Sequence, residues 1–541
     1  MNSNLVTLKV DEATKISDVL QKFRDSSTDL LLVDTKTVVT EPHLELLTDY
    51  PRSITTALVA PQFGGDTRVA FDLVQSASSA YHSIVKGGHN FLGIIRLSQN
   101  QRDRILHVLS EISSTNKPGH TIDLILVGLV RATVPVGAAQ VAGAPYIRSS
   151  DSSMRNKTSQ DIASLNQARL RLKLANRAND GFFSVFFLRK FSKLFTWAAI
   201  KLRLTPNQVT ITSFLIGLLS AYEFSKGEFW ATFAGAVLLQ LSIIVDCVDG
   251  ELARYTRKFS SFGAWLDAIT DRIKEYLVYF ALAIGAEKNG KDVWVLAIGM
   301  MLFQTIRHLS DYNYTRIKRT RSSELKALPF EQVSDEYVPV TREKKSRLRY
   351  WAGKIIQFPI GERWLVISVT SVVGGALLTF IAMPIFSLIS IAVVFKGRFV
   401  GTLKWPKNRV NQALIDNQLD FFTHSKSTNR FDWLEPSLLR LIEGALIILA
   451  LNLFELDSRS IFLILFAILF GHYDSLYRAL AGEQKPKWLS HLGLYIPGRL
   501  LLIALFIALD LTLQPLVYYF GLLYFVVSSL QWIAANFKKG K

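Results

Sequence analysis

The stretch "VDCVDGELARYTRKFSSFGAWLDAITDR", residues 245–272, places four aspartates between apolar runs that are long enough to span a bilayer. A charged carboxylate at the centre of a membrane costs roughly 2.5 kcal/mol or more. Because such a cost is tolerated mainly where the charge is used, these aspartates indicate a functional site.

The polar residues of this stretch fall into two groups with helical spacing. The first group follows the positions i, i+3, i+4, i+7 and i+8 and so lies on one helix face: Asp246, Asp249, Gly250, Ala253 and Arg254. The second group, on the next helix, follows i, i+4 and i+8: Gly263, Asp267 and Asp271. Only the eight residues 255–262 join the two groups. We therefore expect antiparallel helices whose four carboxylates converge near the cytoplasmic ends of the second and third spans.

The four aspartates need a counter-charge, because like charges in one pocket repel strongly. Ligands that are all carboxylates, with no His or Cys, favour hard divalent cations, so the sequence predicts Mg²⁺ or Mn²⁺. Two ions roughly 3.5–4 Å apart would clamp a diphosphate. Gly250 and Gly263 would let a ligand or a backbone approach closely, and Arg254 can bind a phosphate through its planar guanidinium.

Two simpler interpretations compete with a catalytic site. The aspartates could be solvated charges of a cytoplasmic loop, or an ion relay in a transporter. A loop has no need of Gly, Ala and Arg at fixed places, which favours the catalytic interpretation. Cys247, between two of the aspartates, is expected to be a small packing residue.

The fixed positions D-x-x-D-G-x-x-A-R-(eight residues)-G-x-x-x-D-x-x-x-D run from Asp246 to Asp271. This pattern resembles the signature of the CDP-alcohol phosphotransferases, or CDP-alcohol phosphatidyltransferases, and the resemblance covers residues from about 181 to 402. It implies a membrane core of six helices. It also implies that a hydroxyl-bearing acceptor displaces CMP from a CDP-alcohol donor, often CDP-diacylglycerol, and forms a phosphodiester.

The resemblance assigns roles to single residues. Asp246, Asp249 and Asp267 would bind two metal ions, and Asp271 would complete the acidic set and act as the base for the acceptor hydroxyl. The CDP part would be received by Gly250, Ala253 and Arg254, while Gly263 would keep the helices close. Arg307 and Arg363 are candidate acceptor-binding residues, and His308 and Asp311 lie near the first of them. Interfacial snorkelling explains these last four equally well.

Residues 1–147 are predicted to form a soluble α/β domain. The runs "DLLLVD", "TTALVAP", "FLGIIRL" and "IDLILVGLV" read as strands, and "QRDRILHVLSEISS" reads as an amphipathic helix. This part loosely resembles the later portion of sugar-type nucleotidyltransferases, without their Gly-rich, Arg-containing loop; "GGDT" and "KGGHN" are poor substitutes. We expect a degenerate, non-catalytic domain, followed by a linker over residues 148–180 that becomes helical.

The remaining chain is predicted to be mainly α-helical and to cross the membrane several times, which agrees with the 49% of hydrophobic residues in the whole 541-residue sequence. "GFFSVFFLRKFSKLFTWAAIKLRL", residues 181–204, mixes aromatics with cations and predicts a helix in the headgroup region. An ordinary amphipathic core helix is the alternative. Ten apolar segments follow, at 208–224, 229–253, 264–286, 293–313, 363–381, 384–400, 437–455, 460–477, 496–511 and 514–535. Residues 181–402 would form the transferase core, 403–436 a cytoplasmic connector and 437–541 a C-terminal four-helix membrane domain.

The charge distribution predicts the orientation. Lys and Arg exceed Asp and Glu by 62 to 44, and cationic residues gather in the loop that begins at residue 314. The positive-inside rule places this loop, the active site and the N-terminal domain in the cytoplasm, and it explains the net charge without nucleic acid. Residues 1–20 contain no signal peptide. We expect a multi-pass protein of the plasma membrane in contact with membrane lipids.

Several questions stay open at the level of sequence. The last four spans carry charged residues near their cytoplasmic ends, which suit a structural or lipid-contacting role as well as a second site: Arg440, Glu443, His472, Asp474, Arg478 and Arg499. An ion or lipid transporter and an inactive scaffold are rival functions. The acceptor could be inositol phosphate, glycerol phosphate, serine or another lipid, and a homodimer is one assembly that the sequence allows.

Overall fold

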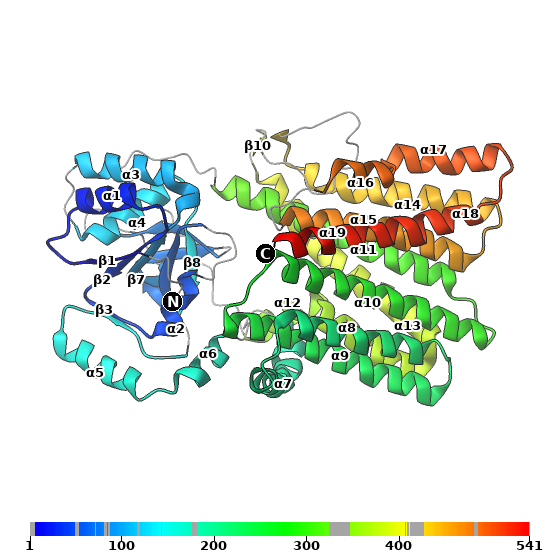
Figure 1. Cartoon of the computed structure of the whole chain (residues 1–541), viewed down its shortest axis with the longest axis horizontal. Helices are drawn as coiled ribbons and strands as arrows, with labels where there is room; N and C mark the ends of the chain where they lie inside the picture. Colours follow the sequence, from blue (N-terminus) through cyan, green and yellow to red (C-terminus); the bar gives the residue numbers. More distant parts are fainter. Residues whose placement is uncertain are drawn as a thin grey trace. The chain divides into compact units, whose positions relative to one another are not determined.

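The structure of the protein is a computed structural model (Figure 1). It describes residues 6–48, 54–70, 72–79, 84, 87–115, 119–141, 143–175, 181–323, 347–405, 407, 410–411, 427–480 and 485–539. The described chain divides into two compact units, one within Met1–Asn176 and the other comprising most of the residues from Arg177 onwards. The first unit is an α/β domain and the second is almost wholly helical, which confirms the predicted fold class.

The α/β unit is built on a mixed sheet of seven strands in the order β1-β2-β7-β4-β8-β6-β5. The strands are β1 (Val6–Val10), β2 (Leu30–Asp34), β4 (Thr56–Gly65), β5 (Thr67–Ala70), β6 (Leu73–Ala77), β7 (Gly87–Leu97) and β8 (Gly137–Gln140). β1 is parallel to β2 and β4 is parallel to β8, whereas β7 runs antiparallel to both β2 and β4. Two short strands, β3 (Thr37–Val38) and β9 (Ile147–Arg148), form a separate pair.

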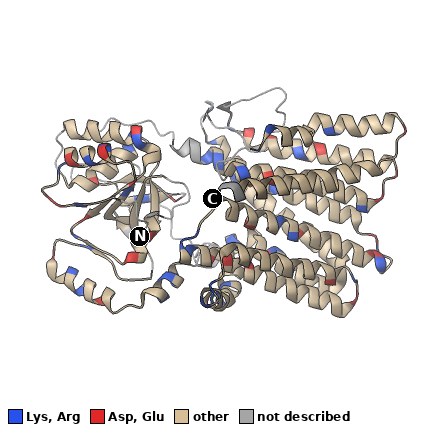
Figure 2. Ribbon diagram, in the orientation of Figure 1, with Lys and Arg blue, Asp and Glu red and all other residues tan. Residues whose placement is uncertain are grey.

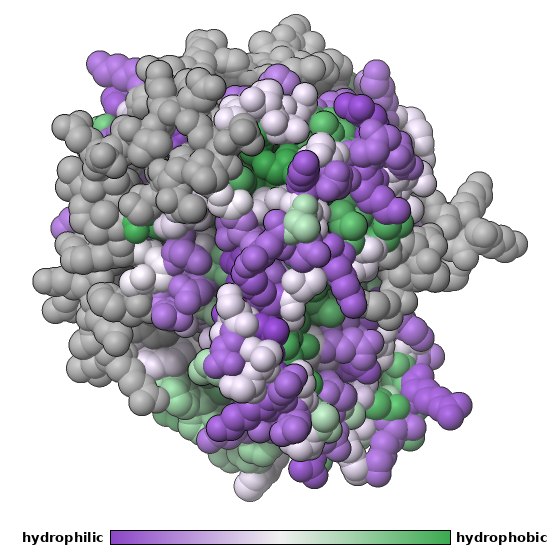
Figure 3. Space-filling view, turned by 90° about the vertical axis from the view of Figure 1, so that its left-hand side faces the viewer, coloured by the Kyte–Doolittle hydropathy of each residue, from purple (hydrophilic) through white to green (hydrophobic). Residues whose placement is uncertain are grey.

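Helices cover both faces of this sheet. Alternation along the strands divides its apolar residues between two cores, so Leu30 and Leu32 point to one face and Leu31 to the other. The larger core is closed by α1 (Ile16–Asp25), α3 (Arg102–Thr115) and α4 (Thr121–Arg131), and the smaller by α2 (Glu41–Thr48). Among the described residues on the face shown in Figure 3, which lies at the left of Figure 1, hydrophilic side chains prevail, as expected of a unit in water.

One predicted strand of this unit is wrong. "IDLILVGLV" lies in helix α4, where every residue from Thr121 to Leu129 except Asp123 is buried. Periodicity cannot separate a short apolar strand from a helix that is buried on all sides, so the run carried no signal for either. The other three predicted strands lie in β2, β4 and β7, and the predicted amphipathic helix is α3, which confirms those predictions.

The glycine pairs of "GGDT" and "KGGHN" lie in neighbouring strands of the same sheet. Gly65 of β4 pairs with Gly87 of β7. A Cβ atom at Gly65 would lie 2.1 Å from the carbonyl oxygen of His89, and one at Gly87 would lie 2.1 Å from that of Gly65. Close approach of the two strands therefore accounts for Gly65 and Gly87, whereas a Cβ atom at Gly64 or Gly88 would meet no atom within 4 Å.

The described part of the predicted linker packs on the α/β unit. It forms β9, α5 (Ser152–Ala163) and α6 (Gln167–Ala175). Arg148 Nε donates to Asp34 Oδ2 at 2.7 Å, and Arg171 Nη2 donates to Glu45 Oε1 at 2.8 Å. These ion pairs hold both ends of the segment to the domain.

The helical unit contains the following elements: η2 (Ser184–Leu188), α7 (Arg189–Lys201), α8 (Pro206–Phe224), α9 (Phe229–Thr256), α10 (Ser261–Lys288), α11 (Trp294–Ser323), α12 (Arg347–Ile356), α13 (Ile360–Leu403), α14 (Glu435–Leu453), α15 (Ser458–Leu480), α16 (Lys487–Leu492), α17 (Tyr495–Ala508), α18 (Gln514–Leu516), η4 (Val517–Tyr524) and α19 (Phe525–Lys539). The short pieces are η1 (Gln99–Gln101), in the α/β unit, and η3 (Asp432–Leu434), β10 (Val410–Asn411) and β11 (Ser427–Thr428). Long stretches of these helices lack charged residues, which gather towards the helix ends (Figure 2).

Five helical stretches of the described chain are long and apolar enough to cross a membrane: Phe229–Thr256, Ile360–Leu403, Ser458–Leu480, Lys487–Ala508 and Gln514–Asn536. The other predicted spans coincide with α8, α10, α11 and α14, which are helical but not among the five. Several helices expose large apolar side chains, among them Leu219, Val373 and Leu501. Such a surface suits lipid, so the chain is a membrane protein with several spans.

Helix α13 contains two predicted spans joined at Gly375, whose φ of 72° breaks the helix. Thr370 Oγ1 donates to Thr379 Oγ1 at 3.0 Å, which a continuous helix would place more than two turns apart. The chain therefore reverses at Gly375. The predicted break at residues 382–383 is wrong, because Pro384 sits inside the second helix and glycine supplies the turn.

The predicted interfacial segment is helical in η2 and α7. Its large side chains Phe187, Phe191, Leu194 and Trp197 are each at least half exposed. Lys201 Nζ lies 3.6 Å from the ring centre of Trp197. Exposed aromatics beside cations suit the headgroup region better than a protein core.

Candidate active site

Helices α9 and α10 carry the predicted aspartates. Arg257 ends α9 with a left-handed φ of 63°, and Ser260 Oγ caps α10 by accepting a hydrogen bond from Gly263 N at 2.9 Å. Helix α8 packs against both α9 and α10. The short connection and this shared neighbour bring the two acidic faces together, as the helical spacing predicts.

Three of the four aspartates form one cluster. Asp246, Asp267 and Asp271 each offer a carboxylate oxygen, and these oxygens lie within 4.8 Å of one another. Asp249 is not part of that group; it is buried one turn further along α9, and its Oδ2 accepts a hydrogen bond from Thr210 Oγ1 of α8 at 2.5 Å. The structure therefore separates a three-carboxylate cluster from a fourth acid held by a threonine.

Lys274 is a member of this site that the sequence analysis did not single out. Its side chain is fully buried, and Nζ lies 2.7 Å from Asp246 Oδ1, 3.1 Å from Asp271 Oδ1 and 2.9 Å from Ser213 Oγ. Lys274 follows Asp267 and Asp271 by seven and three residues, a spacing that puts all three on one helix face and could have revealed it. It supplies one positive charge to an acidic pocket.

The acids are suited to divalent cations. Lys274 pairs with Asp246 and Asp271, and its one positive charge cannot balance the four carboxylates gathered in this partly buried place. Oδ1 of Asp271 is buried, and no described residue makes a hydrogen bond of good geometry to it. An all-oxygen set of this kind, without His or Cys, matches the preference of Mg²⁺ and Mn²⁺.

The glycines and Arg254 of the pattern lie next to the acids. A Cβ atom at Gly250 would lie 3.1 Å from Arg254 Nη1, so the absence of a side chain makes room for the guanidinium. A Cβ atom at Gly263 would lie 2.8 Å from Asn207 Oδ1 of α8. Gly263 thus permits close approach of α8, whereas the sequence analysis expected contact between the two helices that bear the acids. Cys247 packs against the apolar core, as predicted.

Glu251 joins the interfacial helix to this region, and it too was missed. Its carboxylate is buried and accepts hydrogen bonds from Arg189 Nη1 at 2.7 Å, Ser192 Oγ at 2.7 Å and Thr196 Oγ1 at 2.6 Å. All three donors belong to α7. Since Glu251 lies between Asp249 and Ala253, the position of α7 is tied to the acidic face of α9.

Both candidate acceptor-binding arginines are buried in a second polar cluster. Arg363 binds Glu275 of α10 through Nε at 2.9 Å and Nη2 at 3.0 Å, and Arg272 Nη1 donates to the same carboxylate at 2.8 Å. Arg307 Nη2 and Arg363 Nη1 each lie 3.4 Å from the carbonyl oxygen of Phe358. Two arginines thus bind one glutamate, and Arg307 adjoins Arg363 at the carbonyl of Phe358.

The neighbours predicted with Arg307 have partners of their own. His308 Nδ1 lies 3.2 Å from Tyr473 Oη, and Asp311 forms an ion pair with Arg398. The charged residues of the last four spans pair with one another as well. Glu443 binds Arg440 and Arg499, each at 2.6 Å, and Asp474 binds Arg478 at 2.7 Å.

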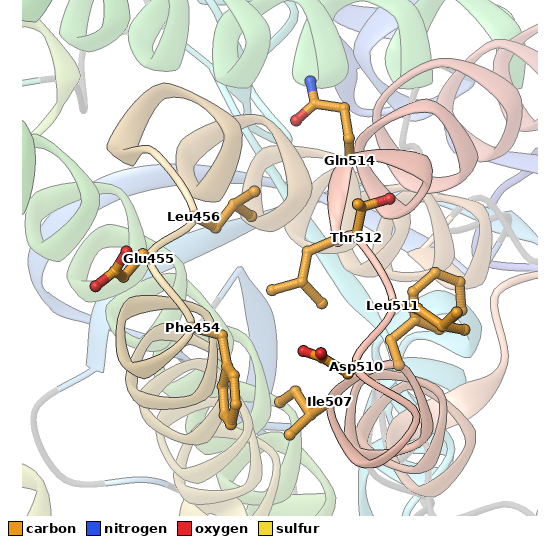
Figure 4. Close-up of a pocket in the computed structure, with 10 residues that line it drawn as sticks. Phe454, Glu455, Leu456, Ile507, Asp510, Leu511, Thr512 and Gln514 are labelled. Atoms are coloured by element: carbon orange, nitrogen blue, oxygen red, sulfur yellow. The ribbon is translucent and has the colours of Figure 1, made fainter.

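A cavity of about 270 Å³ lies elsewhere in the helical unit, between the turns after α14 and α17 (Figure 4). Figure 4 shows Asp510 turned towards its middle and Glu455 turned away. It is lined by residues within 454–456 and 506–514, none of them a predicted site residue. The acidic cluster, and not this cavity, is therefore the candidate active site.

The profile of the CDP-alcohol phosphatidyltransferase family matches residues 203–330, which include every aspartate of the cluster. Residues 203–330 form a CDP-alcohol phosphatidyltransferase domain. The resemblance noted in the sequence is thereby confirmed over this range. The transferase domain begins just before α8 and includes α8 to α11.

Characterised relatives match parts of the chain. A bifunctional IPC transferase and DIPP synthase of Aquifex aeolicus is 33% identical over 150 residues, which cover 26% of this chain and 34% of the relative. An archaetidylinositol phosphate synthase of Pyrococcus horikoshii is 40% identical over 98 residues, 18% of this chain and 50% of the relative. A phosphatidylinositol phosphate synthase of Mycolicibacterium smegmatis is 33% identical over 94 residues, which cover 17% of this chain and 41% of the relative. The chain spans at most half the length of these three relatives.

Proposed function

We propose that the protein is an integral membrane transferase that displaces CMP from a CDP-alcohol. The oxygen of an acceptor hydroxyl would form a bond to the phosphorus that carries the donor alcohol, while the bond from that phosphorus to CMP breaks. The products are CMP and a phosphodiester. The observation that carries this proposal is the convergence of Asp246, Asp267 and Asp271 from two helices, inside the region that matches the family.

The site residues would have different roles in this reaction. Asp246, Asp249, Asp267 and Asp271 would hold two Mg²⁺ or Mn²⁺ ions, which supply charge neutralisation at the diphosphate when bound. Asp271 would also take the proton of the acceptor hydroxyl, and Lys274 Nζ lies 3.1 Å from its Oδ1. Gly250, Ala253 and Arg254 would receive the CDP group, and Gly263 keeps α8 against α10.

The arginine cluster supports an anionic acceptor. Arg272, Arg307 and Arg363 are buried; Arg272 and Arg363 both bind Glu275, whereas Arg307 donates to the backbone carbonyl of Phe358. Nη1 of Arg307 has no hydrogen-bond partner among the described residues. Buried cations without enough carboxylates to pair with would be stabilised by a bound anion, and a phosphorylated alcohol carries one. One relative is named an archaetidylinositol phosphate synthase and another a phosphatidylinositol phosphate synthase, and inositol phosphate as the acceptor would agree with these names.

The remaining assignments complete the proposal. The acidic site and the α/β domain would face the cytoplasm at the plasma membrane, as the positive-inside rule predicts. The domain structure would be that expected from the sequence: an α/β domain over residues 1–147, a linker to 180, the transferase core over 181–402, a connector to 436 and a C-terminal membrane domain. The α/β domain would be a degenerate, non-catalytic nucleotidyltransferase.

The test is transfer from radiolabelled CDP-diacylglycerol by the purified full-length protein, with inositol phosphate, glycerol phosphate or serine as acceptor. We expect CMP release and a labelled phosphodiester, with inositol phosphate the best acceptor. Asp271→Asn should abolish both, while Asp510→Asn, which changes an exposed acid in the turn after α17, should not. Absence of product with every acceptor, together with cation transport by reconstituted protein, would favour the transporter.

A further inference from the structure

Helix α15 is the most enclosed of the candidate spans. In its most apolar stretch 83% of the residues are buried, whereas the other four spans reach 44% at most. It lies beyond residues 203–330, the range that matches the family, so the transferase pattern does not explain it. It packs against η4 and against α10, the helix that carries Asp267 and Asp271.

Two adjacent residues of α15 hold α10 on either side of its aspartates. Asp474 Oδ1 accepts a hydrogen bond from Trp265 Nε1 at 3.0 Å, and Tyr473 Oη lies 3.1 Å from Tyr276 Oη. Trp265 precedes Asp267 by two residues, and Tyr276 follows Asp271 by five. The contacts with α15 therefore bracket the acid-bearing segment of α10.

The group that binds Trp265 is itself fixed from several sides. Asp474 is fully buried and also accepts hydrogen bonds from Arg478 Nε at 2.7 Å and Ser528 Oγ of α19 at 2.9 Å. Lys485 Nζ lies 3.3 Å from its Oδ2. A buried carboxylate with this many partners has one orientation, so the position of the Trp265 indole is determined by α15 and α19.

The second contact extends to α11. Tyr473 Oη is 3.2 Å from His308 Nδ1, and Tyr276 Oη is 2.8 Å from Thr305 Oγ1. All four side chains come from helices of one compact unit. The hydroxyl of Tyr473 thus fixes α10 against α11 as well as against α15.

From these contacts we infer that α15 positions Asp267 and Asp271, with Asp474 and Tyr473 as its positioning residues. Metal ligands must be held to within about 0.5 Å by groups around them, and directional hydrogen bonds restrict the sliding of one helix along another more than apolar contacts do. The C-terminal helices would then serve the transfer reaction without touching its substrates. This inference rests on the proposed function of the acidic site.

The experiment compares Trp265→Phe and Tyr473→Phe in the full-length protein. Each variant removes one hydrogen-bonding group and keeps an aromatic ring. Ser475→Ala is the control on the same helix, because Ser475 Oγ bonds only to Gly471 O within α15, and Tyr518→Phe is the control for an exposed tyrosine hydroxyl. Mn²⁺ affinity is measured by electron paramagnetic resonance, and kcat and KM are measured with CDP-diacylglycerol.

We expect both variants to bind Mn²⁺ about twofold to tenfold more weakly and to lose kcat by a similar factor, since Trp265→Phe loses one buried hydrogen bond and Tyr473→Phe loses the two that its hydroxyl makes. KM for the donor should change less than kcat, and the controls should match the wild type. A merely structural role would lower the melting temperature of the variants and leave the Mn²⁺ affinity of the folded protein unchanged, which would overturn the inference alone. A wild-type protein that neither binds Mn²⁺ nor releases CMP would overturn the proposed function and this inference together.

Discussion

Replacing Lys274 by methionine tests whether the acidic cluster is built for cations. Methionine keeps most of the length and apolar volume of the side chain and removes its charge. Nζ of Lys274 lies 2.7 Å from Asp246 and 3.1 Å from Asp271, and the side chain is fully buried. Without it, no cation would remain within ion-pair distance of these two carboxylates among the described residues.

The size of the effect follows from burial. The two carboxylates are only 14% and 17% exposed, so removal of their partner leaves nearly buried charges uncompensated. Breaking a buried ion pair in this way costs about 3–5 kcal/mol. At about 2 °C for each kcal/mol, the melting temperature in EDTA should fall by roughly 6–10 °C.

A divalent cation should reverse this loss. Binding to the folded state alone stabilises by about 2.7 kcal/mol at a hundred times the dissociation constant. The variant also lacks the charge that competes with the ion. Mg²⁺ should therefore raise the melting temperature of Lys274→Met by several degrees more than that of the wild type, as measured by differential scanning fluorimetry in detergent.

Lys226→Met is the matched control. Lys226 forms an ion pair of the same length, 2.7 Å, with Glu223, but both side chains are partly exposed, so its loss should cost about 1 kcal/mol or less and should not depend on Mg²⁺. If Lys274→Met is as stable as the wild type in EDTA, or if Mg²⁺ stabilises the two proteins equally, the acidic cluster does not depend on a cation.

Four further predictions concern the rest of the chain. Transfer should stop in excess EDTA and should be poorly supported by Ca²⁺, which is larger and less strict in geometry than Mg²⁺; full turnover in EDTA would contradict this. Asp249→Asn should weaken the binding of CDP-alcohol with Mn²⁺ in calorimetric titration, whereas Asp271→Asn should keep binding and lose turnover; equal loss of binding would contradict the division of roles. Glu251→Ala should free α7 and speed tryptic cleavage at its basic residues, because Arg189 loses its buried partner, while Glu228→Ala should match the wild type; unchanged cleavage would show that α7 is held otherwise. The Asp271→Asn protein should release no pyrophosphate from CTP with any alcohol phosphate, because no Gly-rich triphosphate loop was found; pyrophosphate release would make the protein bifunctional.

Local spacing predicted those parts of the structure that depend on a single helix or strand. The three clustered aspartates were found because helical periodicity places them on facing sides of neighbouring helices, and strand β2 was found because its apolar run is short and flanked by polar residues. Helix α4 was missed since burial on all sides removes the periodic signal. The turn at Gly375 was missed since Pro384 is the more conspicuous residue.

Contacts between distant segments could not be predicted from spacing. Tyr276 and Tyr473 are 197 residues apart, and Trp265 and Asp474 are 209 apart. Each residue alone is typical of an ordinary membrane helix with an aromatic or a charged side chain near its end. Only the fold brings these residues together. It also shows why α15 contains a buried aspartate, since Asp474 binds Trp265.

Helix α10 contributes residues to both charged clusters of the helical unit, one mainly acidic and one mainly basic. Asp267 and Asp271 belong to a cluster with more carboxylates than cations, whereas Arg272 and Glu275 belong to a cluster with more arginines than carboxylates. Asp271 and Arg272 are consecutive, so the place where an anionic acceptor would bind adjoins the place where the diphosphate would be held. An acceptor anchored by its phosphate at the arginines would bring a nearby hydroxyl within reach of Asp271, the residue proposed to take its proton. The order of charges along one helix thus favours transfer between two anionic substrates over passage of a cation, for which the arginines would be a barrier.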